Sequence, residues 1–456
     1  MNIENGGISM LLNFTVSNYK SFKESNTLSM VPAPKQKGLD YSICKEKIGK
    51  TSYKALCSTV MYGPNASGKT NIIGAMDTFR AIVLRGNIRN SEEQASPNAA
   101  AYSLELIPNK DISAPVTMAI EFIDNGVKYK YEITLDIGLF LERDKKRKIL
   151  SETFYVNNAM VFQRGETIKI GNLSQISSYL IEADISKNRS FADISEKSLL
   201  ADELFLTGAF KLLFAPKLVQ QFTDWISEKF MVIYHANEVQ FINRFADPKE
   251  KTIYIDTTTQ QAAKLFGINS NGIGYFSGDD GTMKLGSVID NLNIAKGKGV
   301  VIQSDIYESY GTLRFVNIFP LIIRALDTGS TLVIDEFDAS IHPIALMNII
   351  NIFHNDEVNT RHAQLIFNTH NPIFLNSNMF RRDEIKFVER DDTTHESSIY
   401  ALSDFGTSGK NAVRKGDDYM KNYFVDQYGA INNIDFTDVI KDVLGVNGES
   451  SDEKTN

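Results

Sequence analysis

The sequence is poor in cysteine, and it lacks any long apolar segment. Its two cysteines, Cys44 and Cys57, are too few for a disulfide framework and do not have the spacing of metal ligands. No apolar run reaches the roughly 18 consecutive residues that a membrane-spanning helix needs. These absences exclude a disulfide-stapled scaffold and a membrane-spanning helix, and they predict a protein of the reducing cytoplasm without membrane association.

The chain also lacks a strong charge of one sign. Its formal net charge is −8, from 48 Lys and Arg residues against 56 Asp and Glu residues. This balance disfavours bulk binding to nucleic acid or to an anionic membrane, although it leaves room for a local basic face. Hydrophobic residues make up 43% and charged residues 23% of the 456 positions, as in an ordinary globular protein of about two or three domains.

The segment VMYGPNASGKTNII, at residues 60–73, contains a match to the pattern GxxxxGK[ST]. Residues 58–62 are apolar and typical of a short β-strand, and residues 71–84 carry apolar side chains at helical spacing. A strand, a glycine-rich turn and a helix in this order are typical of a phosphate-binding loop. The alternative is a tight surface turn that matches the pattern by chance, but the strand–helix context favours nucleotide binding.

The residue types of this loop suit a phosphate ligand. Gly63 and Gly68 let the backbone turn so that its N–H groups face an anion, and the helix N-terminus adds a positive partial charge. Lys69 can reach the β- and γ-phosphates, and the hydroxyl of Thr70 can hold Mg²⁺. We therefore expect the nucleotide to be bound by Gly63, Asn65, Ser67, Gly68, Lys69, Thr70 and Asn71.

A second segment, STLVIDEFDASIHP at residues 330–343, supplies the acidic residues that a nucleotide-hydrolysing site needs. Its apolar run at residues 332–334 is typical of a strand that is buried on both faces. Asp335 ends this strand and is placed to hold Mg²⁺ with Thr70, while Glu336 suits a general base for an attacking water. Taken alone, the segment fits an acidic turn after a strand equally well; the phosphate loop upstream favours the catalytic interpretation.

A third apolar run, at residues 365–367, leads to Thr369, His370 and Asn371. In open parallel sheets, ligands lie at the carboxyl ends of the strands. We expect His370 to contact the γ-phosphate or the attacking water, and we group it with Lys69 and Glu336 as a catalytic residue. The alternative is a histidine with a purely structural role.

Residues 309–312, with the sequence Ser-Tyr-Gly-Thr, precede an apolar segment with helical spacing. A serine, a glycine and a helix N-terminus form a second anion-binding surface. One nucleotide does not need two such surfaces, so Ser309 and Gly311 are interpreted as ligands that close on the nucleotide of a neighbouring molecule. The alternative is an ordinary helix N-cap made by Ser309 or Thr312.

The remaining sequence indicates a chain of several lobes. Residues 116–137 form two alternating runs around an Asp-Asn-Gly turn, which is a strong hairpin signal. Residues 198–230 predict two helices, while residues 267–281 are rich in glycine and typical of a loop. We expect an N-terminal lobe (10–149), an inserted helical subdomain (150–290), a C-terminal lobe (291–445) and a disordered tail (446–456).

In this order, the motifs resemble those of ABC-type ATPase heads of the SMC, RecF and OLD branch. Within that branch, the chain is similar to the small AAA-labelled ATPases of bacterial anti-phage and abortive-infection systems. The resemblance covers most of the chain except residues 150–290. It assigns Walker A to residues 63–70, the signature motif in its SxGT form to 309–312, Walker B to 332–336, the D-loop to 337–343 and the switch histidine to His370.

The resemblance implies an α/β fold, namely an ABC-type P-loop ATPase head with a mixed sheet and an inserted, mainly helical arm. It implies ATP hydrolysis with ATP and Mg²⁺ bound, and a head-to-tail homodimer, or a higher oligomer, in which two heads enclose two ATP molecules. It further suggests that this dimerisation switch controls a separately encoded effector, a nuclease or a toxin, in anti-phage defence. A RecF-like DNA-binding repair ATPase is the alternative, although the charge balance does not favour nucleic acid as a partner.

Overall fold

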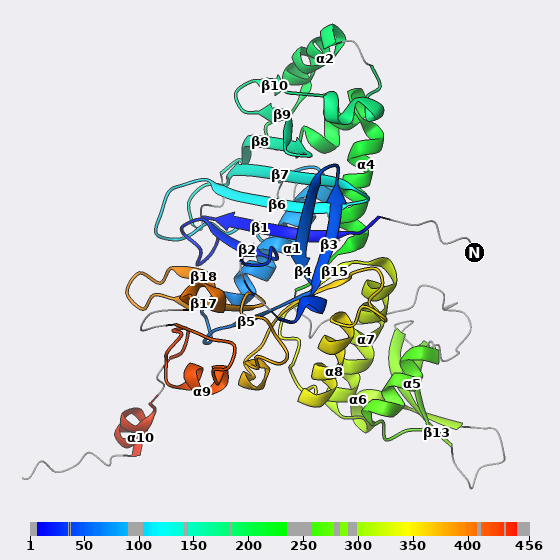
Figure 1. The fold of residues 1–456 in the computed structure, drawn as a ribbon, viewed down its shortest axis with the longest axis vertical. Helices are drawn as coiled ribbons and strands as arrows, with labels where there is room; N and C mark the ends of the chain where they lie inside the picture. The colour runs from blue at the N-terminus through cyan, green and yellow to red at the C-terminus, as the bar shows by residue number, and fades with distance from the viewer. Residues whose placement is uncertain are drawn as a thin grey trace, which may run out of the picture.

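The computed structural model describes residues 7–34, 36, 38–89, 104–140, 142, 145–182, 185–234, 257–277, 283–290, 299–407, 412–432 and 435–444. Within these residues the chain forms two large sheets, two smaller ones and ten α-helices (Figure 1). None of the described helices is both long and apolar enough to cross a membrane. The tail expected at residues 446–456 lies outside the described residues.

An antiparallel sheet of seven strands forms the upper part of the molecule in Figure 1. Apolar and polar residues alternate along its strand β7, so that one face of the sheet is buried and the other is partly exposed. The turn between β6 and β7 holds Asn125 and Gly126 at positive φ, which confirms the hairpin predicted for residues 116–137. The strand order is β10 (Ile168–Ile170), β9 (Ala159–Arg164), β8 (Lys148–Val156), β7 (Val127–Asp136), β6 (Val116–Asp124), β1 (Met10–Ser17) and β2 (Asn26–Ser29).

Helices of the inserted segment pack on the buried face of this sheet. The single tryptophan, Trp225, stacks on Phe122 of β6 with ring centroids 3.6 Å apart. The carboxylate of Glu152, on β8, is fully buried and accepts hydrogen bonds from the backbone N–H groups of Phe205 and Leu206 at 2.8 and 2.7 Å. It also forms an ion pair at 3.4 Å with the guanidinium of Arg164 on the neighbouring strand β9, while the two backbone hydrogen bonds hold residues 205 and 206 to β8. The helices of this segment are α2 (Ile185–Ser198), α3 (Lys211–Leu213) and α4 (Pro216–Asp224), with π-helical turns at Leu206–Phe210 and Trp225–Lys229 that contain Leu206 and Trp225.

A second sheet, of six strands, carries the predicted nucleotide motifs. Its strands β11, β15, β16, β5 and β17 are parallel, and β18 pairs with β17 in the antiparallel direction, which confirms the mixed sheet. The strands that hold the motifs are buried throughout, as continuous apolar runs predict. The order is β11 (Phe230–Ile233), β15 (Thr331–Ile334), β16 (Gln364–Asn368), β5 (Ser58–Tyr62), β17 (Ile385–Arg390) and β18 (Ser397–Ala401).

Helices cover both faces of this second sheet. On one face, α1 (Lys69–Arg85) lies between the two large sheets, and its Phe79 contacts Phe14 of β1 edge to face at 5.8 Å. On the other face lie α7 (Tyr310–Thr328) and α8 (Pro343–Phe353). The fold is therefore layered, with the antiparallel sheet, α1, the mixed sheet and the α7–α8 pair in succession.

The segment around residues 267–281 differs from its predicted loop. Residues 272–277 form strand β12, which pairs along its length with β13, because the apolar residues between the glycines alternate and find a partner strand. This three-stranded sheet packs beside α7, together with two short helices. The elements are α5 (Thr257–Phe266), β12 (Gly272–Ser277), β13 (Met283–Asp290), β14 (Gly299–Gln303) and α6 (Ser304–Tyr307).

The expected start of the inserted subdomain falls inside a strand. Residue 150 lies within β8, and β8, β9 and β10 extend the antiparallel sheet of the N-terminal lobe. The segment 150–290 thus contributes strands as well as helices, and its division from the two lobes stays a prediction. The remaining elements are β3 (Ile43–Ile48), which pairs with β4 (Thr51–Leu56), and the C-terminal helices α9 (Tyr419–Phe424) and α10 (Thr437–Leu444).

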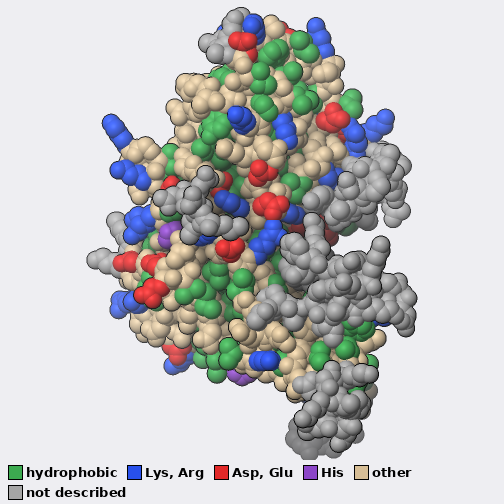
Figure 2. Space-filling view, turned by 90° about the vertical axis from the view of Figure 1, so that its right-hand side faces the viewer, with side chains coloured by type: hydrophobic (Ala, Val, Ile, Leu, Met, Phe, Trp, Pro, Cys, Tyr) green, Lys and Arg blue, Asp and Glu red, His purple; other side chains and the backbone are tan. Residues whose placement is uncertain are grey.

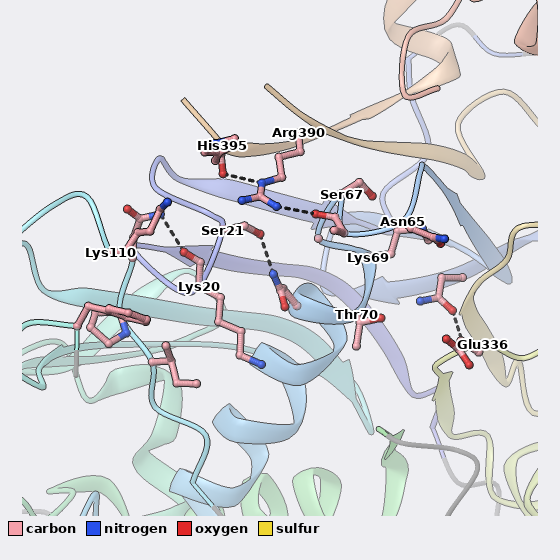
Figure 3. Close-up of a pocket in the computed structure, with 18 of the residues that line it drawn as sticks. Lys20, Ser21, Asn65, Ser67, Lys69, Thr70, Lys110, Glu336, Arg390 and His395 are labelled. Atoms are coloured by element: carbon pink, nitrogen blue, oxygen red, sulfur yellow. Dashed lines mark hydrogen bonds between the residues drawn. The ribbon is translucent and has the colours of Figure 1, made fainter. Parts of the chain in front are cut away.

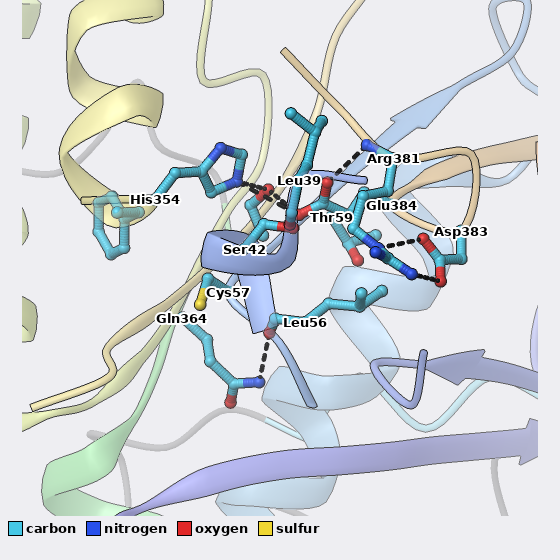
Figure 4. Close-up of polar contacts among 12 residues, drawn as sticks. Leu39, Ser42, Leu56, Cys57, Thr59, His354, Gln364, Arg381, Asp383 and Glu384 are labelled. Atoms are coloured by element: carbon cyan, nitrogen blue, oxygen red, sulfur yellow. Dashed lines mark hydrogen bonds and ion pairs between the residues drawn. The ribbon is translucent and has the colours of Figure 1, made fainter. Parts of the chain in front are cut away.

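Buried polar side chains fasten the amino ends of the parallel strands (Figure 4). The amide of Gln364, the first residue of β16, accepts a hydrogen bond from Leu11 N–H at 2.6 Å and donates to the Leu11 carbonyl at 3.2 Å. It also donates to the Leu56 carbonyl at 2.8 Å and accepts from the Thr331 hydroxyl at 2.9 Å. One fully buried side chain therefore joins the two large sheets at the end opposite to the nucleotide motifs.

Candidate nucleotide-binding site

The predicted phosphate loop connects β5 to α1, and its glycines are required by close packing. Gly63 and Gly68 have φ angles of 154° and 113°, which non-glycine residues rarely adopt. A Cβ atom on Gly63 would lie 2.1 Å from the Val388 carbonyl oxygen, and one on Gly68 would lie 2.6 Å from the Ser397 hydroxyl. The loop thus packs closely against the paired strands β17 and β18, and its backbone remains open to the cavity described below.

The side chain of Lys69 folds back into this loop. Its ammonium donates hydrogen bonds to the carbonyl oxygens of Gly63 at 2.7 Å and Pro64 at 2.9 Å, and the residue is 5% exposed. Burial lowers the pKa of Lys69 to about 8, although the carboxylates of Asp335 and Glu336 act in the opposite direction. A buried ammonium with a lowered pKa is an electrostatic site that an anion would stabilise.

The acidic strand meets the phosphate loop at the carboxyl edge of the sheet. Strands β15, β16 and β5 are parallel neighbours, so the residues that follow them converge. The hydroxyl of Thr70 donates to Asp335 Oδ1 at 3.2 Å, across 265 positions of sequence. The two residues predicted to hold Mg²⁺ are therefore neighbours. Two oxygen ligands fit Mg²⁺, which keeps several waters and takes its other ligands from substrate phosphates.

Glu336 and His370 lie at the same edge. Glu336 follows Asp335 with a φ of 48°, in the left-handed region, and its side chain lines the cavity. His370 follows β16 and lines the same cavity. Burial, and then the charge of Lys69, lower the pKa of His370, so its imidazole is neutral at pH 7 and can both donate and accept a hydrogen bond.

A single cavity of about 510 Å³ joins these groups (Figure 3). Of the predicted residues, Gly63 and Asp335 lie beside the cavity rather than in its lining. The hydroxyl of Ser67 is buried and has no hydrogen-bond partner within the described part of the chain, as a group awaiting a ligand would be. This orphaned hydroxyl, the glycine cradle and the Thr70–Asp335 pair fit a nucleotide with Mg²⁺. The predicted residues in the lining are Asn65, Ser67, Gly68, Lys69, Thr70, Asn71, Glu336 and His370.

The cavity is also lined by residues that lie outside the phosphate loop and the acidic strand. Arg390 donates to the His395 carbonyl at 3.0 Å, and Figure 3 shows both above the phosphate loop. Lys20 lies 2.8 Å from the carboxylate of Glu105, and Ser21 accepts a hydrogen bond from the side chain of Asn71 at 2.7 Å. Lys20 and Ser21 belong to residues 18–22, with the sequence NYKSF, a segment that resembles the first strand of these ATPase heads, near the adenine. The other lining residues come from separate segments and were not predicted; they are Ala66, Ile107, Pro108, Asn109, Lys110, Phe140, Asn368, Arg390 and His395.

Ser309 and Gly311 do not line this cavity. Ser309 is the N-cap of α7, and its hydroxyl accepts a hydrogen bond from Thr312 N–H at 3.1 Å. A Cβ on Gly311 would lie 2.2 Å from the Ser340 carbonyl, so the start of α7 packs closely on the D-loop of its own chain. Tyr310 between them is 56% exposed. Ser309 therefore caps α7, as the alternative interpretation predicted, and the same end of the helix is exposed to solvent.

The residue before Ser309 anchors this helix end to the three-stranded sheet. The buried carboxylate of Glu308 accepts hydrogen bonds from the N–H groups of Asn269 and Ser270 at 2.9 and 3.1 Å. It also accepts from the hydroxyls of Ser270 and Ser287, at 2.6 and 3.2 Å. The position of Ser309 is thus fixed by strands of the inserted segment.

Comparison with known proteins assigns the chain to a protein family. A family model described as "AAA domain, putative AbiEii toxin, Type IV TA system" matches residues 58–376. No curated protein matches the chain. Among solved structures, the SMC head domain from Thermotoga maritima is 15% identical, with a TM-score of 0.34 over 86% of this chain and 98% of that chain.

Two further solved structures have similar scores. The SmcHead bound to the C-winged helix domain of ScpA is 12% identical, with a TM-score of 0.36 over 86% of this chain and 97% of that chain. The Smc head domain with an extended coiled coil, bound to the C-terminal domain of ScpA derived from Pyrococcus furiosus, has the same identity and TM-score, over 86% and 96%. The family model carries more weight, since it spans more than half of the chain and includes the phosphate loop, the acidic pair and His370. The chain therefore belongs to this AAA-domain family of P-loop ATPases.

Proposed function

We propose that this ATPase hydrolyses ATP with Mg²⁺ at the cavity between the phosphate loop and the acidic strand. The observation that supports it most directly is the Thr70–Asp335 contact, because it brings a hydroxyl and a carboxylate together where a Mg²⁺–phosphate complex needs them. The loop from Gly63 to Asn71 holds the phosphates, with Lys69 as the charge partner. Thr70 and Asp335 hold Mg²⁺, which neutralises charge on the phosphates when it is bound.

Two side chains act on the water and on the γ-phosphate. Glu336 lines the cavity and accepts the proton of the attacking water as general base. His370, being neutral, donates a hydrogen bond to the γ-phosphate or orients the water. Lys69 then stabilises negative charge that develops on the phosphate oxygens.

The hydrolysis drives a dimerisation switch. Ser309 and Gly311 lie on an exposed helix end away from their own cavity, which suits contact with the γ-phosphate held by a second copy of the chain. Loss of the γ-phosphate removes this shared contact and weakens the dimer. The switch governs a separately encoded effector, a nuclease or a toxin; the family description, which names a type IV toxin–antitoxin system, favours a role in abortive infection.

The RecF-like alternative requires a basic surface for DNA. On the face drawn in Figure 2, Lys and Arg side chains are interspersed with Asp and Glu among the described residues. Together with the net charge of −8, this distribution favours a protein effector over nucleic acid. DNA affinity that falls steeply with salt would reverse this preference.

The proposed chemistry is tested with Glu336→Gln, using Glu357→Gln, an exposed glutamate outside the cavity lining, as the matched control. Loss of the general base should slow ATP turnover by roughly 10²–10⁴. ATP should still bind, and the ATP-bound dimer should persist in size-exclusion chromatography with light scattering. Lys69→Ala should instead abolish nucleotide binding. Near-normal turnover of Glu336→Gln would refute Glu336 as the base.

A further inference from the structure

A buried amide contacts both acidic residues of the site. Asn368 is the last residue of β16, between β15 and β5, and it is 1% exposed. Its Nδ2 donates to Asp335 Oδ1 and its Oδ1 accepts from the Glu336 N–H, each at 2.5 Å. Asn368 also lines the cavity, together with Glu336. One side chain thus bridges the metal-holding carboxylate and the backbone of the general base.

The chemistry of the partners fixes the direction of both bonds. A backbone N–H can only donate, so it requires the amide oxygen, and the carboxylate of Asp335 accepts from the amide nitrogen. Aspartate at this position could accept from Glu336 but could not donate while ionised, and leucine could do neither. Among side chains of this size, an amide serves both partners without adding charge beside two carboxylates.

The second bond supports an unusual backbone conformation. Glu336 has a φ of 48°, which residues with a side chain adopt rarely and which the surroundings must hold in place. The side chain of Asn368 accepts a hydrogen bond from the N–H of Glu336, and the guanidinium of Arg314 donates to the carbonyl oxygen of Glu336. The peptide groups on both sides of Glu336 are therefore fixed, and the side chain is directed into the cavity.

The first bond supports the metal-holding group. Asp335 Oδ1 receives hydrogen bonds from both Thr70, at 3.2 Å, and Asn368. Two donors from different elements, α1 and β16, hold the carboxylate in one orientation. Partners of this kind behind a metal ligand commonly contribute about 10–100-fold in metal affinity or activity.

We propose that Asn368 is a positioning residue that sets the geometry of the Mg²⁺ ligand and the general base together. This inference rests on the proposed function, since it acts through Asp335 and Glu336. Two consequences follow. Loss of the Asn368 amide should weaken the response to Mg²⁺ through Asp335, and it should slow the chemical step through Glu336, while metal-free nucleotide binding by the loop stays unchanged.

The experiment compares Asn368→Leu with Asn359→Leu. Asn359 is also a buried asparagine, and it bonds to the carbonyls of Phe353 and Ala363 at 2.8 and 2.9 Å, away from the cavity. Both substitutions remove a satisfied buried amide and keep a similar volume, so both lower the thermal midpoint. Only Asn368→Leu should lower kcat per folded molecule, by about 10–100-fold, and raise the Mg²⁺ concentration for half-maximal turnover by about tenfold.

A double variant separates positioning from general structural support. At saturating Mg²⁺, where the contribution through Asp335 is removed, Asn368→Leu should add no more than about twofold to the loss caused by Glu336→Gln alone, because the two losses share one group. A fluorescent ATP analogue in EDTA should bind Asn368→Leu as it binds the wild type. Losses that multiply, or an unchanged kcat and Mg²⁺ response, would overturn the proposal. Asn368→Ala, which also removes both the donor and the acceptor, replaces the leucine variant if that variant does not fold.

Failure of the proposed function gives a different pattern. A wild-type chain that binds but does not hydrolyse ATP would refute the ATPase mechanism. The Asp335 half of the inference would still be measured by the enhancement that Mg²⁺ gives to binding of the fluorescent nucleotide. Asn368→Leu should reduce this enhancement by about tenfold, and Asn359→Leu should leave it intact. Equal enhancement in both variants would contradict the inference independently of hydrolysis.

Discussion

Nucleotide binding should take up protons near pH 8, because Lys69 starts from a lowered pKa of about 8. A polyphosphate beside the ammonium favours the charged form and restores the pKa to at least its ordinary value of about 10.5. At pH 8, half of Lys69 is charged in the free protein and nearly all of it in the complex. Binding should therefore take up about half a proton at pH 8 and about 0.9 at pH 9.

The same change in the pKa of Lys69 sets the sign and size of the pH dependence of nucleotide affinity. The ligand prefers the ammonium, so affinity is highest below pH 8, falls as pH rises through 8, and levels off above the pKa of the complex. With pKa values of about 8 and 10.5, the loss between pH 7 and pH 9 is about tenfold. The nucleotide itself contributes little in this range, since its last phosphate proton is lost near pH 6.

The assay is isothermal titration calorimetry with ADP and Mg²⁺, which avoids turnover, in buffers of different ionisation enthalpy. The slope of the binding enthalpy against the buffer enthalpy gives the number of protons taken up. Lys69→Arg is the control, because a guanidinium stays charged throughout and should show no uptake. Uptake below about 0.1 proton at pH 8 in the wild type, or equal uptake in Lys69→Arg, would show that burial does not shift Lys69.

Three other perturbations follow from the structure. Ser309→Asp keeps the N-cap but places a negative charge toward a partner's γ-phosphate, so ATP-dependent dimerisation should weaken at least about tenfold in analytical ultracentrifugation. The neutral cap in Ser309→Asn should change dimerisation little. Gly68→Ala should cost more than about tenfold in ADP affinity, whereas Gly126→Ala, at a positive φ of 74° with nothing within 4 Å of the added Cβ, should not affect binding. Glu152→Ala leaves the buried guanidinium of Arg164 without its carboxylate partner. The free energy of unfolding should fall by about 3–5 kcal/mol in urea titrations followed by Trp225 fluorescence. A loss under about 1 kcal/mol would show that the ion pair is not essential to stability.

Contiguous motifs carried most of the information that the sequence offers about this site. The phosphate loop and the acidic strand each depend on neighbouring residues, so their strand–loop–helix and strand–turn contexts are visible locally. The cavity lining from Asn65 to Thr70, with Glu336 and His370, follows from these contexts. The convergence of the segments follows from one rule, that parallel strands place their carboxyl ends at a common edge.

Residues that depend on tertiary contacts were not visible in this way. Lys110 and Arg390 reach the cavity from separate elements, and no local pattern marks them. Asn368 did leave a signal, since a polar residue that ends a buried apolar run must find partners. The pairing of Asp335 and Glu336 with that amide became apparent only from the structure.

Strand pairing was also not visible in the sequence. Glycine content favoured a loop at residues 267–281, but residues 272–277 form β12, which is stabilised by its pairing with β13, and residues 278–281 lie outside the described residues. The predicted inserted subdomain at residues 150–290 contains helices, and it also contains β8, β9 and β10, which continue the antiparallel sheet. Strand pairing of this kind is decided by the neighbour, not by the segment itself.

The four hydrogen bonds of Gln364 fix the amino ends of strands in the mixed sheet. Strands β15 and β16 are tied to the antiparallel sheet at their amino ends, where Gln364 also bonds to Leu56, the last residue of β4. At their carboxyl ends the residues that follow contact Thr70 of α1, Arg314 of α7 and the cavity. Under the proposed function, the γ-phosphate is bound at the opposite edge of the mixed sheet from this attachment, where Asp335 and Glu336 contact α1, α7 and β16. A change of nucleotide therefore acts on those contacts first, and not on the junction between the two sheets.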